Sequence, residues 1–192
     1  MSPAEIQRFE SDIMRGATVP PDLRALLTIS TANDPLRAAL GFALLVPGRD
    51  YPLLTGSYLN DADRQNPDIV ANVAAIDDVL ALCTMVAESE DGDMIGYWHG
   101  PERTPTDSAP IVKLDTEGTF GLMQGRTLSE AMLGNDTFSD PERFAEIRAW
   151  FAGFGIDIDA TNWRELSTPD ASTRPDKLHD ALYEQRRASR AT

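Results

Sequence analysis

The sequence is short of the residues that cross-links and metal sites require. It contains one cysteine, Cys83, and two histidines, His99 and His179, in 192 residues. A single cysteine excludes a disulfide within the chain, and three such donors cannot supply the four ligands of a structural zinc site. Cys83 lies in the apolar run VLALCTMVA, where we expect a buried structural thiol rather than a nucleophile.

Long apolar runs are also absent. No stretch approaches the roughly 20 apolar residues that a membrane-spanning helix needs. The first residues, MSPAEIQRFESDIM, lack the basic segment followed by an apolar one that is typical of a secretory signal. We therefore expect a cytoplasmic protein that does not bind membranes.

Basic residues are scarce and unevenly placed. The chain has 31 acidic and 17 basic residues, a net charge of −14. Residues 1–140 hold 22 of the acids and 9 of the bases, whereas residues 141–192 are almost balanced, with 9 and 8. Such a field repels nucleic acid and favours a basic partner. Solubility alone is the alternative explanation of the charge.

The pattern of helix starts and apolar runs predicts the order of the elements. Helices are expected after the capping box Ser2–Glu5, at VPPDLRALL, after Asn33-Asp34-Pro35 and after Asn66-Pro67. GFALLVPG, ALCTMVAES, MIGYW, IVKLD and TFGLM are predicted strands, and YPLLTGSYLNDADRQ a loop-rich segment. Further capping boxes at Thr127–Glu130 and Ser139–Glu142 predict two helices, the second with Phe144, Ile147, Phe151 and Phe154 on one stripe. A last helix is expected around Leu178, Leu182 and Tyr183, with His179 on an exposed face.

Helices, then consecutive strands, then helices are typical of an α+β fold with an antiparallel sheet. We expect the α+β domain to cover residues 1–138 and a C-terminal helical extension, packed on it or appended to it, to cover residues 139–192.

The stretch ESEDGDMIGYWHG concentrates the acidic residues, with Glu88, Glu90, Asp91 and Asp93 within six positions. Its spacing does not match a calcium loop, in which glycine follows the third ligand. Asp91-Gly92 instead predicts a two-residue type I′ hairpin turn with four solvated carboxylates. We predict neither a metal nor a cofactor.

Signals for catalysis are weak. Asp115 and Glu117 in LDTEG flank a tight turn, and an enzyme that uses them is the least favoured function. GLMQGR lacks the Gly-Lys-Ser/Thr ending of a phosphate-binding loop, and we expect it to connect a strand to a helix. The protein is predicted not to be an enzyme.

Tyr97 and Trp98 follow the acidic turn. Adjacent strand residues face opposite sides, so we expect one ring in the core and the other more exposed. An exposed Trp98 beside acids could anchor a partner, because aromatic residues are favoured at binding hot spots. Packing at the edge of the core is the alternative.

VPPDLRALL, the strand pair LCTMVAESEDGDMIGYW and the hairpin IVKLDTEGTFGLMQGRTLSEAML, taken in this order, resemble the SUKH superfamily over roughly residues 15–135. The early strand GFALLV and the leucines of VPPDLRALL depart from that family's more aromatic pattern. The resemblance implies an α+β fold with a strongly bent antiparallel sheet flanked by helices. It also implies no enzymatic activity and, for bacterial members, an immunity protein that neutralises a polymorphic toxin.

A nuclease toxin is basic because it binds nucleic acid, so an acidic immunity protein would associate with it quickly. A scaffold or regulatory interaction module of the same family is the alternative function. The residues expected to bind the basic partner are Glu88, Glu90, Asp91, Asp93, Trp98, Asp61, Asp63, Glu102 and Asp107.

Overall fold

The computed structural model describes residues 1–29 and 34–189. The N-terminal elements are α1 (Pro3–Arg8), the π-helical turn η1 (Phe9–Ile13), α2 (Pro21–Ile29) and α3 (Pro35–Leu40). The strand β1 (Phe42–Leu44) is followed by α4 (Pro52–Thr55), α5 (Asp61–Gln65) and α6 (Pro67–Leu80). The other strands are β2 (Cys83–Ser89), β3 (Met94–Trp98), β4 (Ile111–Leu114) and β5 (Phe120–Leu122). The C-terminal elements are α7 (Leu128–Asp136), α8 (Pro141–Ala152), the 3₁₀ turn η2 (Trp163–Glu165) and α9 (Pro175–Ala188).

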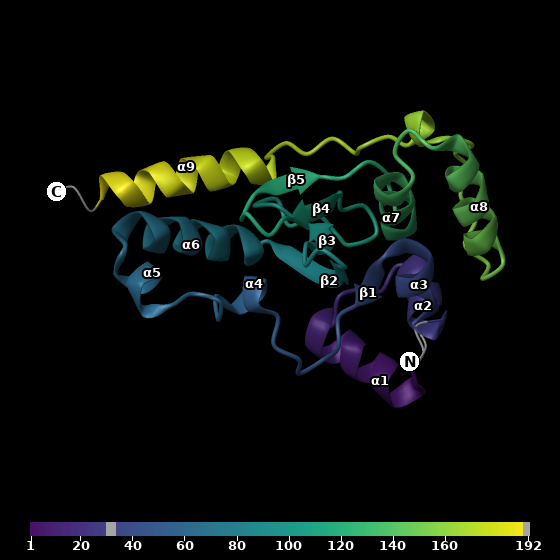
Figure 1. Cartoon of the computed structure of the whole chain (residues 1–192), viewed down its shortest axis with the longest axis horizontal. Helices are drawn as coiled ribbons and strands as arrows, with labels where there is room; N and C mark the ends of the chain where they lie inside the picture. The colour runs from purple at the N-terminus through teal and green to yellow at the C-terminus, as the bar shows by residue number, and fades with distance from the viewer. Residues whose placement is uncertain (30–33, 190–192) are drawn as a thin grey trace.

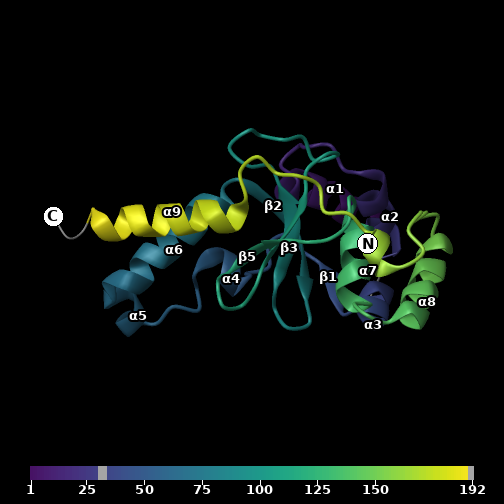
Figure 2. The same ribbon diagram turned by 90° about the horizontal axis from the view of Figure 1, so that it is seen from above.

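The five strands form one open antiparallel sheet in the order β1-β2-β3-β4-β5, which confirms the predicted α+β class. Figures 1 and 2 show the sheet between two groups of helices, with α6 and α9 on one side and α2, α3 and α7 on the other. In residues 139–192, α8 packs on α7, and α9 packs on α6 and β5.

Most predicted helix starts are present, with differences of detail at the caps. Ser2 and Glu5 form the reciprocal capping box. Thr127 accepts a hydrogen bond from the Glu130 N–H, but the Glu130 carboxylate accepts from the Arg126 N–H, so the second box is not reciprocal. For α8 the cap is Asp140, one residue after the predicted Ser139.

Asp34 caps α3, whereas Asn33, the other predicted residue of that cap, lies outside the described residues. The prediction that YPLLTGSYLNDADRQ is loop-rich was wrong, because it contains α4 and α5. Helices of four and five residues are too short to show a hydrophobic period. The local sequence feature that indicates α5 is the capping box of Asn60 and Asp63.

The helix after Asp140 buries Phe144, Ile147 and Phe151, but Phe154 is 40% exposed, so its place on that stripe was wrongly predicted. The reason is that α8 ends at Ala152, after which the chain turns through Gly155 at φ 75°.

The central strand β3 is buried along its whole length. All five of its residues are buried, and Tyr97 and Trp98 are each 2% exposed. The prediction that one of these aromatic rings is exposed was therefore wrong, since helices cover both faces of the sheet at this strand. The Trp98 Nε1–H donates to the carbonyl of Thr173 at 2.9 Å, which satisfies the indole inside the fold.

A β-bulge in β2 requires the glycine in β3. Met85 pairs with Gly96 and Ala87 with Ile95, so the intervening Val86 has no partner on β3. A Cβ added at Gly96 would lie 2.2 Å from the Thr84 carbonyl oxygen, a backbone atom that cannot move without breaking the strand pair.

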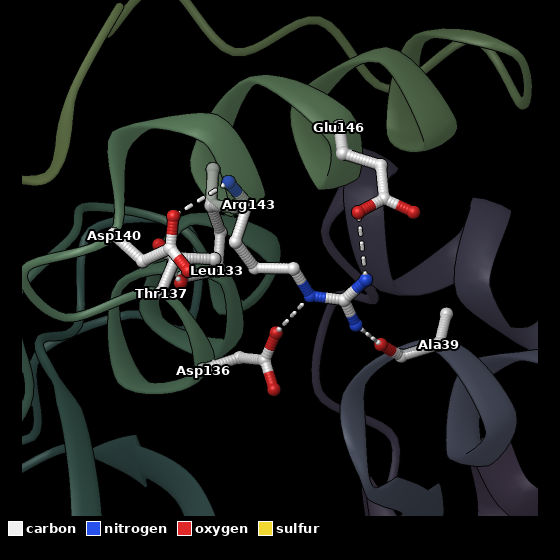
Figure 3. A network of polar contacts seen from close by, with 7 residues as sticks. All are labelled: Ala39, Leu133, Asp136, Thr137, Asp140, Arg143 and Glu146. Atoms are coloured by element: carbon white, nitrogen blue, oxygen red, sulfur yellow. Dashed lines mark hydrogen bonds and ion pairs between the residues drawn. The ribbon is translucent and has the colours of Figure 1, made fainter.

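Arg143 joins three helices at the side of the sheet that carries α7 (Figure 3). Its guanidinium donates to the Asp136 carboxylate at the end of α7 and to the carbonyl of Ala39 in α3. The same side chain pairs with Glu146 one turn along α8. A single side chain of α8 therefore links it to α3 and α7.

The helix α9 runs beside α6 in the opposite direction (Figure 1). His179 was predicted to be exposed, but its side chain is only 14% exposed. Its ring lies 5.9 Å from that of Phe120 and parallel to that of Tyr183 at 6.5 Å. Packing against β5 buries this helix face, which local sequence does not reveal.

Within residues 1–29 and 34–189, the structure contains no helix with the length and apolar character needed to cross a membrane.

We expect Gly96→Ala to lower the free energy of unfolding by about 3 kcal/mol or more, or to prevent folding, because its methyl group would overlap backbone. Gly121→Ala is the matched control, since a Cβ at that strand position meets no atom within 4 Å. Urea denaturation should place Gly121→Ala within about 0.5 kcal/mol of the parent. Equal stability of the two variants would contradict the bulge.

Burial lowers the pKa of His179 below its ordinary value of 6.5, and nearby Asp180 offsets this only in part. As the pH falls below 6.5, His179 therefore binds more protons in the unfolded chain than in the folded one. The stability that the neutral ring contributes is thus complete above pH 6.5 and is lost as the pH falls toward the lowered pKa. Urea denaturation should show a decrease between about pH 7.5 and about pH 5.5 that is smaller in His179→Leu. An identical decrease in both proteins would refute the assignment to His179.

Candidate functional site

The acidic hairpin between β2 and β3 closes between Ser89 and Asp93, with Glu90, Asp91 and Gly92 between them. The Ser89 N–H donates to the Asp93 carbonyl at 2.9 Å, and the Gly92 N–H donates to the Ser89 carbonyl at 3.1 Å. Gly92 has φ 88°, whereas Asp91 is not among the residues of positive φ. The predicted type I′ turn, which needs positive φ at both central residues, was therefore wrong.

Two of the four acidic side chains at this hairpin are turned inward. The carboxylates of Glu88 and Asp93 are only 18% and 15% exposed, and they pair with Arg49 at 3.5 Å and with Lys113 at 3.1 Å. Asp93 also accepts the backbone N–H of Thr116 at 3.3 Å, which ties the hairpin to the β4–β5 turn. The prediction of four solvated carboxylates was wrong for these two, because neighbouring segments bring cations to them.

Glu90 and Asp91 remain exposed at the tip, with Glu90 3.9 Å from Arg37. Glu102 and Asp107 belong to the β3–β4 loop, at the other end of the five-residue β3 and so roughly 17 Å from the tip. The Glu102 carboxylate accepts the hydroxyls of Ser172 and Thr173, and these bonds lower its pKa. The predicted acids therefore do not form one patch.

The predicted acids Asp61 and Asp63 lie on α5. Asp61 is exposed, whereas Asp63 accepts the backbone N–H of Asn60 in the helix cap.

Asp115 and Glu117 are separated by their roles in the β4–β5 turn. Asp115 Oδ1 accepts the N–H groups of Glu117 and Thr119 at 3.0 and 2.8 Å. This carboxylate therefore holds the turn, while Glu117 lines a neighbouring hollow that Asp115 does not line.

That hollow belongs to a groove centred on an exposed aromatic ring. Two adjoining hollows of about 360 and 430 Å³ share Tyr58 and Thr116. We call them together the Tyr58 groove. The first lies between α4 and the β2–β3 hairpin, against Leu53 and Met94. The second lies between α6 and the β4–β5 turn, and its apolar lining comprises Leu59, Ile69, Val73 and Ile76.

The rim of the Tyr58 groove is acidic. Asp63, Asp68 and Glu117 line it, and Tyr58 at its centre is 50% exposed. Burial raises the pKa of Tyr58, and the negative charges of Asp77 and Asp63 raise it further. The Tyr58 ring is thus close enough to the carboxylates of Asp77 and Asp63 to interact with them.

Not every rim acid is available. Asp68 pairs with Arg187 of α9 at 3.2 Å. Within the described part of the chain, the carboxylates of Asp77 and Glu117 have neither a hydrogen bond nor an ion pair. Glu117 is therefore an unpaired carboxylate on the lining of the groove, and Asp77 is an unpaired one that acts on Tyr58 without lining either hollow.

The Tyr58 groove includes some of the residues that the sequence predicted to bind a partner, together with others that the sequence analysis missed. Asp63 and Glu88 line it, and Asp91 and Asp93 flank the lining residue Gly92. Tyr58 takes the place of an exposed aromatic that had been expected at Trp98. Its only local signal is an aromatic residue beside the acidic NDAD cap, in a segment wrongly predicted as loop.

No group of three or more His, Cys, Asp or Glu side chains in residues 1–29 and 34–189 is arranged to hold a metal ion. The arrangement at the groove is instead suited to non-covalent binding, since it combines apolar walls, one half-exposed phenol and unpaired carboxylates.

No protein-family model matches this chain, and no curated protein and no solved structure matches it. The SUKH resemblance stays a prediction from the sequence.

Proposed function

We propose that this chain is a non-enzymatic binding protein of the cytosol that neutralises a basic toxin domain by covering its active site. The observation that carries the binding role is the Tyr58 groove, an apolar trough with a half-exposed aromatic ring and acidic edges. The choice of a toxin as partner rests on the SUKH resemblance and on the net charge of −14.

The chemistry of the groove suits an arginine or lysine side chain. The methylene stem of such a residue can pack against Ile69 and Val73 while its cation lies over the Tyr58 ring. Asp77 and Glu117 then supply opposite charge without first breaking an internal pair. A buried aromatic contact of this kind contributes to affinity, whereas the surrounding acids mainly raise the association rate.

A scaffold or regulatory module would use the same groove for a cationic segment of a different partner. The two functions differ in what lies beside the gene. A neighbouring gene for a large secreted protein with a C-terminal toxin domain supports immunity, and co-expression should then restore growth. Failure to restore growth, together with failure of the two proteins to co-purify, would exclude the immunity role.

With that toxin domain as the probe, Tyr58→Ala should weaken binding by roughly 30-fold, mostly through faster dissociation, because it removes the aromatic contact at the centre of the groove. Glu117→Lys should instead slow association and reduce its dependence on salt, since it reverses an unpaired charge at the rim. Surface plasmon resonance at several salt concentrations separates the two effects.

Asp107→Lys is the matched control, because it makes the same charge change on the β3–β4 loop, away from the groove. We expect it to have a smaller effect on association than Glu117→Lys. If Asp107→Lys is the more harmful change, or Tyr58→Ala binds as tightly as the parent, the partner docks elsewhere. Circular dichroism of each variant verifies that the fold is retained.

A further inference from the structure

A separate hollow has two arginines in its lining, whereas the rim of the Tyr58 groove is acidic. It measures about 260 Å³ and shares only Tyr51 with that groove. It lies where η1, the segment after β1, α4 and the first residues of β2 meet. Its apolar lining includes Ile13, Leu45, Val46, Leu54, Leu80, Cys83 and Met85. The volume is below the roughly 300–1,000 Å³ of drug-sized ligand sites, so the hollow suits a small molecule.

Two arginines line this hollow in a protein with few basic residues. Arg49 lies over the ring of Tyr51, 5.0 Å from its centre, and pairs with Glu88 at 3.5 Å. Arg15 has no ion pair within the described residues. Asp12, the acid among the lining residues, accepts the Ser11 hydroxyl at 2.5 Å. Arg15 thus offers an unpaired cation and Arg49 one that is shared with Glu88, while the field of the whole chain disfavours a polyanion.

The backbone at Arg15 is strained. Its φ is 52°, in the left-handed region, and Gly16 follows at φ 80°. An arginine in that region is less favourable than a glycine, by about 1 kcal/mol. Arg15 follows Met14, the C-cap of η1, where a left-handed residue commonly ends a helix, and its side chain borders the hollow.

Two hydroxyls on the walls have defined hydrogen bonds. The Tyr51 oxygen accepts the Val46 N–H at 2.6 Å, which leaves the phenol proton able to donate. The Thr84 hydroxyl bonds His99 Nε2 at 2.8 Å, and His99 Nδ1 donates to the Thr104 carbonyl at 2.7 Å. Burial raises the pKa of the Cys83 thiol above its ordinary value, and this partly buried thiol donates to the Val79 carbonyl at 3.3 Å.

We propose that this hollow binds a small monoanion with an apolar body, such as an aromatic or short-chain carboxylate. The carboxylate would be held by Arg15 and Arg49, and the apolar body would pack against Ile13, Leu54 and Met85. This binding is independent of the proposed function.

The test uses benzoate and hexanoate as probes, with benzamide and hexanamide as neutral analogues of the same shape. Isothermal titration calorimetry with the full chain should show millimolar or tighter binding of the carboxylates and at least tenfold weaker binding of the amides. Arg15→Gly should weaken carboxylate binding by about tenfold while keeping or raising the thermal stability, because it removes the charge and the strain together.

Leu54→Trp fills the hollow and should abolish binding of both carboxylates, whereas Tyr58→Ala in the neighbouring groove should leave it unchanged. The proposal is overturned if neither carboxylate binds at millimolar concentration, or if amides bind equally well. It is also overturned if Arg15→Gly binds benzoate like the parent. An Arg49→Lys variant gives a second readout, because it keeps the charge but loses the two-pronged contact to a carboxylate.

Discussion

The fold depends on covering both faces of the central strand. β3 is buried at every residue, which requires α6 and α9 on one side of the sheet and α2, α3 and α7 on the other. The Trp98 indole at the end of this strand is satisfied inside the fold by the Thr173 carbonyl, whereas the buried Tyr97 hydroxyl has no hydrogen-bond partner among the described residues. The link before α9 is therefore part of the core architecture and not a free tail.

The packing of segments around the sheet also decides which acidic side chains are paired and which face solvent. At the ends of the strands, acids that local sequence places together are divided between structural pairs and free surface. Glu88 and Asp93 hold Arg49 and Lys113, while Asp91 stays in solvent. Ion pairs with exposed partners contribute little to stability. The hydrogen bond from the Thr116 N–H to Asp93 fixes the hairpin against the β4–β5 turn. In the proposed function, the surface for a partner lies beside the hairpin, at Tyr58, and not on its tip.

The Tyr58 groove and the hollow lined by Arg15 and Arg49 both border α4 and have opposite chemistry. One has an acidic rim around Tyr58, and the other has Arg15 and Arg49 around an apolar lining. Both include Tyr51, whose hydroxyl is bonded to the Val46 backbone. A cationic partner and a small anion would thus be recognised by adjoining parts of one molecule, with segments between β1 and β2 contributing to each.

The sequence by itself determined the α+β class, the strand order in the chain, and helix starts such as those at Ser2 and Asn66, because caps and hydrophobic periods are local properties. It also showed the acidic excess. Only the tertiary structure decided which aromatic ring is exposed, since Trp98 is 2% exposed and bonds Thr173, a residue distant in the sequence, whereas Tyr58 is 50% exposed. The environment of His179 and the pairing of Asp93 were decided in the same way, because each depends on a segment more than ten residues away that packing alone brings into contact.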